Sequence, residues 1–189
     1  MKALSLNILD ITQNSLRAGA DEICISISES VAADSYCIKI KDNGSGIPVD
    51  ILKSITDPFV TTRTTRNIGM GLPLFKYHTE LTGGKLQINS VEGKGTEVTA
   101  NLSFSHFDRQ PLGDIVGVLI ILIAANPAVD FIYTHVTDHG EYTFSTRETK
   151  EYLGVNTLYE RGLLEDLAGM IAVNLMEIEV TGVVYKEIV

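Results

Sequence analysis

Two short stretches of the chain alternate between isoleucine and polar or small residues, and this alternation restricts the fold more than any other feature. Ile23, Ile25 and Ile27 occupy every second position of residues 22–28, and Ile38 and Ile40 do the same in residues 36–41. A period of two places the isoleucines on one face of a strand and the intervening residues on the other. Both stretches are therefore predicted to be half-buried β-strands.

Stretches with helical spacing flank these strands and are predicted to form a second layer. Residues 3–18 and 72–81 repeat apolar side chains at helical intervals, and residues 49–55 suit a shorter helix. Residues 85–89 and 96–104 are predicted to be a second strand pair around a glycine-rich turn. This order of elements predicts a two-layer α/β sandwich with helices on one face of a mixed sheet.

The charge and composition exclude several classes of protein. The chain has 189 residues with 44% hydrophobic residues, proportions typical of a folded globular protein. Only 15 Lys and Arg stand against 24 Asp and Glu, giving a net charge of −9. Nucleic-acid binding ordinarily needs clustered basic residues, so no nucleic-acid partner is expected.

Neither a disulfide framework nor a secretory leader is expected. The two cysteines, Cys24 and Cys37, lie on the predicted strands, and polar residues interrupt the N-terminal region before an apolar run can form. The most apolar stretch, residues 115–125, is about half of the roughly 20 residues that a membrane-spanning helix needs. We therefore expect a soluble, cytoplasmic protein without a membrane span.

A pause in the pattern near residues 105–111 predicts a boundary between residues 1–106 and residues 107–189. The second part is expected to be a smaller α+β region, with a buried helix at 115–125 and a hairpin of residues 129–136 and 141–146. It could pack on the first part or form a homodimer, and it carries no motif that indicates a role.

Two capping-box spacings in this second part predict two further helices. Ser145 precedes Glu148 by three residues, and Thr157 precedes Glu160 in the same way. Residues 177–189 fit either a strand or the end of the last helix.

The first helix carries a carboxylate and an amide one turn apart. Asp10 and Asn14 share a helix face because their spacing is four residues. An amide oxygen suits Mg²⁺, which prefers a few protein oxygens together with phosphates and waters. The carboxylate could orient a water or accept a proton. The alternative is that both residues form only the polar edge of a helix.

Two glycine-containing loops provide further candidates for a nucleotide site. Asp42 ends a predicted strand and is followed by Gly44 and Gly46, a pattern that suits an adenine amino group but also a plain turn. Gly69 and Gly71 open a helix, where backbone N–H groups favour a phosphate. The alternative for this second loop is a solvated, flexible segment.

Taken in order, these motifs resemble the ATP-binding domain shared by sensor histidine kinases, DNA gyrase, Hsp90 and MutL. Residues 8–20 resemble the N box, and the end of that segment is especially similar to MutL. Residues 42–48 resemble the first glycine box, residues 57–63 the box before the ATP lid, and residues 69–72 the second glycine box. The resemblance covers residues 5–104 and implies the Bergerat-type ATP-binding fold.

The resemblance implies a role for each motif residue. Asn14 would hold Mg²⁺, Asp42 would bind the adenine amino group, and residues 57–70 would form a lid over a bent nucleotide. The remaining residues implied to contact ATP are Gly44, Gly46, Thr62, Arg63, Gly69, Gly71 and Thr96. Asp10 occupies the position at which gyrase and MutL carry a longer Glu, so slow hydrolysis is expected.

Three functions stay open at this stage. No helix with a phosphoacceptor histidine precedes the N box, which favours a kinase or ATP-dependent regulator that acts on a separate partner protein. The first alternative is a slow MutL-like ATPase in which Asp10 aligns the attacking water. The second is a non-catalytic module whose binding surface is gated by ATP.

Overall fold

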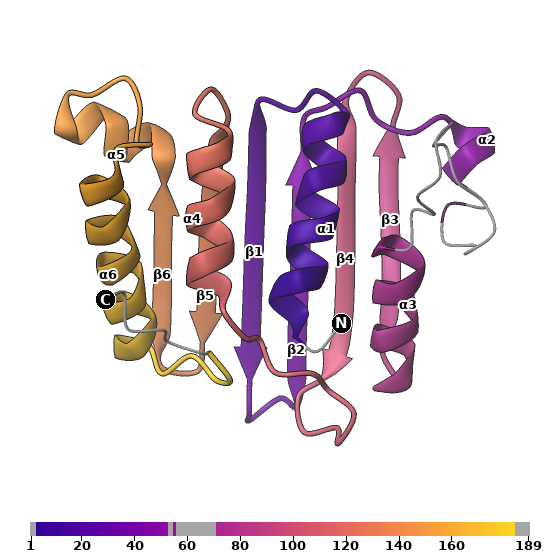
Figure 1. The fold of residues 1–189 in the computed structure, drawn as a ribbon. Coiled ribbons are helices and arrows are strands. Elements are labelled where there is room, and N and C mark those ends of the chain that lie inside the picture. The colour runs from indigo at the N-terminus through magenta and orange to yellow at the C-terminus, as the bar shows by residue number, and fades with distance from the viewer. Residues whose placement is uncertain (1–2, 53–54, 56–70, 184–189) are drawn as a thin grey trace.

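The computed structural model describes residues 3–52, 55 and 71–183. Figure 1 shows these elements in chain order as α1 (Leu4–Arg17), β1 (Glu22–Ser30), β2 (Ser35–Asp42), α2 (Val49–Leu52), α3 (Gly71–Leu81), β3 (Lys85–Val91), β4 (Gly95–Ser103), α4 (Ile115–Ala125), β5 (Asp130–Thr137), β6 (Gly140–Ser145), α5 (Thr146–Leu153) and α6 (Arg161–Glu177).

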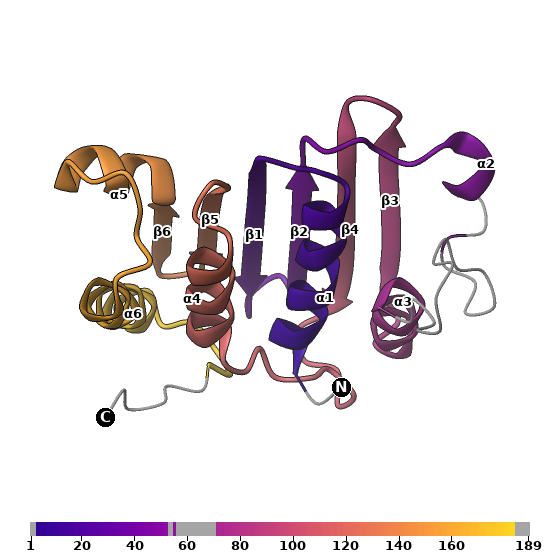
Figure 2. The same cartoon turned by 45° about the horizontal axis from the view of Figure 1, so that its top comes forward.

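The six strands of the described residues join one mixed sheet in the order β3-β4-β2-β1-β5-β6. The pairing of β1 with β5 is parallel, with Ile23 beside Phe131, and the other four pairings are antiparallel. Helices α1, α3, α4 and α6 lie on one face of the sheet, which is clear when the view is turned (Figure 2). The predicted two-layer α/β architecture is therefore confirmed.

The alternating isoleucines form the centre of the core, as their spacing predicts. Ile23, Ile25, Ile27, Ile38 and Ile40 are each at most 1% exposed on the face that the helices cover. Fully burying an aliphatic side chain of this size contributes about 1.5–3 kcal/mol. The opposite face carries polar side chains, which explains why the described helices can leave that face uncovered.

Residues beyond 106 continue the same sheet and the same core. The β5–β6 hairpin extends the sheet beside β1, and α4 contacts both α1 and α6. The carbonyls of Pro111 and Leu112 accept hydrogen bonds from the N–H groups of Leu4 and Ser5, at 3.0 and 2.9 Å, and so satisfy the first turn of α1. The division between residues 1–106 and 107–189 stays a prediction.

Both predicted helices are present, as α5 and α6, but only one of the two capping boxes forms. Ser145 caps α5, because its hydroxyl accepts the N–H of Glu148 at 3.3 Å. The box at Thr157 is wrong, since α6 begins only at Arg161 and Glu160 makes no side-chain cap bond. Leu158, only 2% exposed, is buried in the core, and this packing favours an irregular course before α6 over an earlier helical turn.

The described chain answers the question of residues 177–189 only as far as residue 183, where the last helix does not continue. Helix α6 ends at Glu177, and Val183 then forms an isolated parallel bridge with Gly113. Residues 184–189 lie outside the described part of the chain. Within that part, no helix combines the length and apolarity that crossing a bilayer requires.

A buried carboxylate links the ends of β1 and β5 to the segment after α6. Glu29 is 5% exposed and accepts hydrogen bonds from the backbone N–H and the hydroxyl of Thr181. His135 Nε2 lies 3.5 Å from Glu29 Oε1, and His135 Nδ1 is 2.7 Å from the Tyr133 hydroxyl. Burial acts to raise the pKa of Glu29, but His135 and Thr181 outweigh it and hold that pKa below its ordinary value.

Glu29→Gln should therefore lower the free energy of unfolding at neutral pH. The variant should also lose less of that free energy than the wild type when the pH falls. A carboxylate with a lowered folded-state pKa stabilises the protein above its unfolded-state pKa of about 4.3, and this contribution disappears as pH falls through the folded-state value. Hydrogen bonds to a charged group are worth about 1.5–3 kcal/mol, so a loss of that order is expected at pH 7.

Urea unfolding at several pH values between 7 and 3 measures both effects. Glu141→Gln is the matched control, because Glu141 lies exposed on β6 outside this network. The ordinary pKa of Glu is about 4.3. If the free energy of unfolding of Glu29→Gln falls below this pH as steeply as that of the wild type, the assigned role of Glu29 is wrong.

Candidate nucleotide-binding site

Asp42 is a buried carboxylate at the end of β2. Its side chain is 7% exposed and is oriented by three hydrogen bonds from separate parts of the chain. Ser15 on α1 donates to Oδ2 at 2.5 Å, and the N–H groups of Gly44 and Thr96 donate to Oδ1 at 3.0 and 3.1 Å. A carboxylate accepts about four hydrogen bonds, so Oδ2 keeps one acceptor position for a ligand donor.

The loop after Asp42 packs closely against its neighbours on both sides. A Cβ on Gly44 would lie 2.9 Å from the Cβ and the carbonyl oxygen of Ala18, and a Cβ on Gly46 would lie 2.2 Å from the carbonyl oxygen of Val91. Gly46 also has a φ of +68°, which glycine adopts readily. These glycines are thus required by packing within the chain, and their contact with a nucleotide stays a prediction.

Asp10 and Asn14 share one face of α1, as predicted from their spacing. Gly71, at the start of α3, lies against Asp10, because a Cβ there would be 3.2 Å from the Asp10 Cβ and 3.5 Å from its Oδ2. The structure thus brings the end of the second glycine box beside Asp10. Asn14 Oδ1 accepts a hydrogen bond from the Arg17 guanidinium at 2.9 Å, which leaves one lone pair on that oxygen.

Thr96 reaches the site through its backbone and is held by a serine on β3. The hydroxyls of Thr96 and Ser90 are 2.9 Å apart, and Ser90 Oγ also accepts the N–H of Ile47 at 2.8 Å. Ser90 therefore ties the loop after Asp42 to the β3–β4 hairpin.

The predicted residues thus divide into a group that the structure brings together and a group that it does not describe. Asp42, Gly44, Gly46 and Thr96 lie near the end of β2. Asp10 and Asn14 lie on α1, and Gly71 of α3 packs against Asp10. Three predicted contacts, Thr62, Arg63 and Gly69, lie outside the described residues, as does the predicted lid at 57–70.

The sequence motifs assigned no individual role to three residues that contact the site. Ser15 and Ser90 orient Asp42 and Thr96, and Arg17 contacts Asn14. The sequence marks Ser15 only as a polar residue at a buried position of the helix. It cannot indicate the partner Asp42, because that residue lies on another element. Arg17 is three residues from Asn14, a spacing that indicates a shared helix face.

The donor set fits Mg²⁺ better than a metal held by the protein alone. Within the described ranges, no group of three or more His, Cys, Asp or Glu side chains is placed to hold a metal ion. Mg²⁺ commonly takes one or two protein oxygens and completes its shell with phosphates and waters. The Asn14 amide oxygen is suited to that limited role.

A solved structure with a similar fold agrees with this architecture. The crystal structure of the N-terminal domain of a DNA repair protein matches 77% of this chain and 53% of its own, with a TM-score of 0.52. The sequences are 20% identical over this match, so the likeness concerns the fold alone.

Curated relatives of the chain include several sensor kinases. The sensor histidine kinase ZraS of Escherichia coli O157:H7 is 31% identical over 56% of this chain, and sporulation kinase D of Bacillus subtilis strain 168 is 35% identical over 52%. The matches cover 23% and 19% of those two proteins, so the chain spans about a fifth of the length of these relatives.

The family model supplies the remaining comparison. The model of the histidine kinase-, DNA gyrase B- and HSP90-like ATPases matches residues 2–106, which is more than half of the chain and includes every motif described above. The family resemblance inferred from the ordered motifs is thereby confirmed, and the chain belongs to the histidine kinase-, DNA gyrase B- and HSP90-like ATPase family.

Proposed function

We propose that the chain binds ATP or ADP with Mg²⁺ at the site formed by Asp42 and Asn14, and acts as a kinase or ATP-dependent regulator on a separate partner protein. The observation that carries the proposal is the Asp42 carboxylate, which is buried, oriented by three donors and left with one acceptor position. An adenine amino group supplies the donor that this position needs.

The face of α1 supports the phosphate end of the same nucleotide. Asn14 offers its amide oxygen to Mg²⁺, and Arg17 adds a positive charge 2.9 Å from that oxygen. A guanidinium at this position suits phosphate oxygens. Arg17 occupies only one lone pair of Asn14 Oδ1, so the other would remain for Mg²⁺.

Phosphate transfer to another protein is the activity most in keeping with the kinase relatives. Those relatives are a sensor histidine kinase and a sporulation kinase, and the family model matches residues 2–106 of this chain. A labelling assay with γ-³²P-ATP, with and without candidate partner proteins, tests this. Label that appears on the partner supports transfer, whereas release of free phosphate alone favours the ATPase.

A specific contact favours slow hydrolysis as the second candidate. Asp10 lies against Gly71 at the end of the second glycine box, since a Cβ on Gly71 would be 3.2 Å from the Asp10 Cβ. A carboxylate beside this box could accept a proton from a water that attacks a bound phosphate. The Asp10 side chain is one methylene shorter than the Glu expected of a hydrolysing relative, so turnover should be slow.

Asp42→Asn should weaken binding of ATP by roughly 10- to 150-fold. The amide presents donors where the adenine amino group needs an acceptor, and a charge-assisted hydrogen bond is worth about 1.5–3 kcal/mol. Isothermal titration calorimetry measures the affinity, and thermal unfolding checks that the loop remains folded. Ser15→Ala, which removes a donor and keeps the carboxylate, should lose less affinity. Wild-type affinity in Asp42→Asn would remove Asp42 from the adenine site.

Asn14→Ala should weaken ATP binding in Mg²⁺ more than it weakens binding in EDTA. The reason is that the amide oxygen serves the metal ion and not the base. Gln13→Ala is the matched control, since Gln13 also contacts Arg17, at 3.4 Å, but is not the proposed ligand. Equal losses for Asn14→Ala in both conditions would exclude it as a metal ligand.

Asp10→Asn should abolish whatever hydrolysis the chain performs and leave the affinity for ATP unchanged. Asp10→Glu should raise the rate, because a displacement of about 1 Å in a catalytic group can cost on the order of 100-fold. Steady-state phosphate release measures both variants. A wild-type rate in Asp10→Asn would show that Asp10 is no general base and only part of the polar edge of α1.

A further inference from the structure

Three polar side chains form a row across the end of the sheet at which the candidate site lies. Strands β2 and β3 end and β4 begins at this side of the sheet (Figure 1). Ser90 on β3 pairs with Thr96 on β4. The pairing of Lys41 with Glu97 sets the register of β2 with β4. Asp42, the next residue of β2, therefore comes opposite Thr96 and completes the row.

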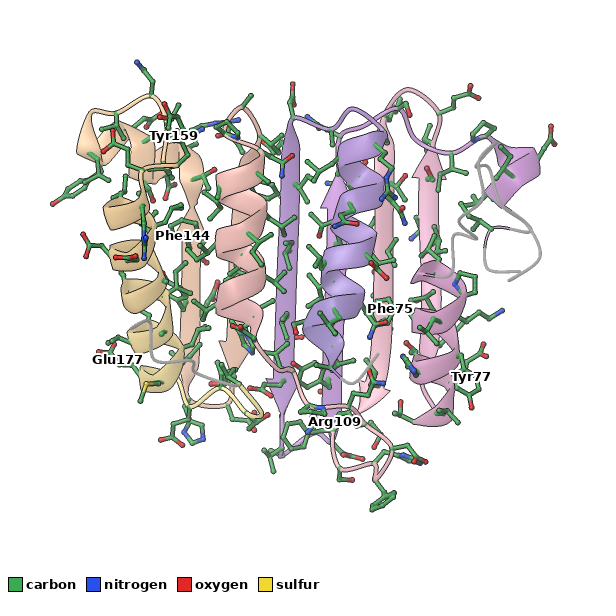
Figure 3. The ribbon with its side chains drawn as sticks, viewed as in Figure 1. Phe75, Tyr77, Arg109, Phe144, Tyr159 and Glu177 are labelled. Atoms are coloured by element: carbon green, nitrogen blue, oxygen red, sulfur yellow. The ribbon has the colours of Figure 1, made fainter. Side chains whose placement is uncertain are left out.

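The row lies on the face of the sheet that the helices cover. Alternation along β4 puts Thr96 on the same side as Val98 and Ala100, which are at most 4% exposed. Beyond the row this face is apolar, and Figure 3 shows the buried Phe75 between α1 and α3 in front of the sheet. A ligand group that reaches Asp42 on this face therefore comes beside the Thr96 hydroxyl.

Ser90 makes three contacts with its single hydroxyl group. Its Oγ accepts the N–H of Ile47 at 2.8 Å and donates to the carbonyl of Gly95 at 3.0 Å. It also lies 2.9 Å from Thr96 Oγ1, where either hydroxyl could supply the proton. A hydroxyl has one proton and two acceptor positions, so a proton directed at Gly95 is not available to Thr96. All three contacts are hydrogen bonds only if Thr96 donates to Ser90.

We propose that Ser90 holds the Thr96 hydroxyl as an acceptor toward the ligand, and that the site thereby selects a 6-aminopurine nucleotide over a 6-oxopurine nucleotide. Ser90 acts through Thr96 and is therefore a positioning residue. The inference rests on the proposed function, because it concerns the base that the Asp42 carboxylate binds.

The selection follows from two acceptors that lie side by side. With its proton directed at Ser90, Thr96 presents only lone pairs beside the carboxylate of Asp42. An amino group, which has two N–H donors, suits this arrangement. A carbonyl oxygen in the same place finds lone pairs and no donor, so the loss of its water is not compensated. Adenine has an amino group at C6, whereas hypoxanthine has a carbonyl there.

The contribution of Thr96 to this selection depends on Ser90. A threonine hydroxyl that is free to rotate donates to a carbonyl as readily as it accepts from an amino group. Asp42 only accepts, whatever residue occupies position 90. Removal of the Ser90 hydroxyl should therefore narrow the preference for the amino group without abolishing it.

Calorimetric titration of the full chain with ATP and with inosine triphosphate (ITP), both with Mg²⁺, tests the proposal. ITP carries a carbonyl at C6 and a proton on N1 and otherwise matches ATP, and competition against ATP keeps weak binding of ITP measurable. The wild type should prefer ATP. In Ser90→Ala the ratio of the two affinities should fall roughly 2- to 12-fold, the range that one neutral hydrogen bond provides.

Three further variants separate this role from a structural one. Ser90→Thr keeps a hydroxyl and should keep the wild-type ratio. Thr96→Val removes the hydroxyl that Ser90 orients, so it should narrow the ratio by itself, and adding Ser90→Ala to it should change the ratio no further. Asn89→Ala is the matched control, because Asn89 is an exposed neighbour on the opposite face of β3 and should leave the ratio unchanged. Thermal unfolding checks that each variant is folded.

Each opposite result overturns the proposal. A purely structural role for Ser90 would lower both affinities together, so an unchanged ratio in Ser90→Ala excludes the orienting role and leaves the proposed function standing if ATP still binds. A ratio that Ser90→Ala lowers further in the Thr96→Val background would show that Ser90 acts through another group. A wild type that binds neither nucleotide overturns the proposed function and this inference together.

Discussion

The buried carboxylate of Asp42 constrains the part of the molecule on which the candidate site depends. A buried carboxylate is strongly unfavourable unless donors satisfy it. Here those donors come from α1 through Ser15, from the loop itself through Gly44 and from β4 through Thr96. One side chain therefore sets the positions of the first helix, the glycine loop and the second hairpin relative to each other. The same three segments carry most of the motif residues that the structure describes.

The parts of the fold that depend on local sequence patterns could be predicted, and the parts that depend on contacts between distant residues could not. Alternation at Ile23–Ile27 and the helical spacing of α1 are local signals, and the predicted elements agree with the structure. The partnership of β1 with β5 depends on residues far apart in the chain, which no local pattern encodes. Leu158 shows the same limit, because its burial in the core prevailed over the capping spacing at Thr157.

The sequence predicted which residues belong to the candidate site, but not the contacts between them. The spacing of Asp10 and Asn14 places them on one helix face, and the ordered motifs led to the correct family. The hydrogen bond from Ser15 to Asp42, and the contact of Gly71 with Asp10, join segments that only the folded chain brings together. Gly44 and Gly46 illustrate a further ambiguity, since close packing within the protein and close approach of a ligand favour the same residue.

The parallel pairing of β1 with β5 has a consequence for the order in which the chain folds. As the chain is synthesised, β1 and β2 can form their antiparallel pair early, because a short turn joins them. The other edge of β1 must wait until residues 130–137 have been made, since Ile23 pairs with Phe131. During that interval β1 is an unpaired edge with an apolar face, the kind of surface at which nascent chains associate wrongly. Rapid burial of the isoleucines beneath α1 would shorten this period of exposure, so the first helix protects the growing chain before it serves any ligand.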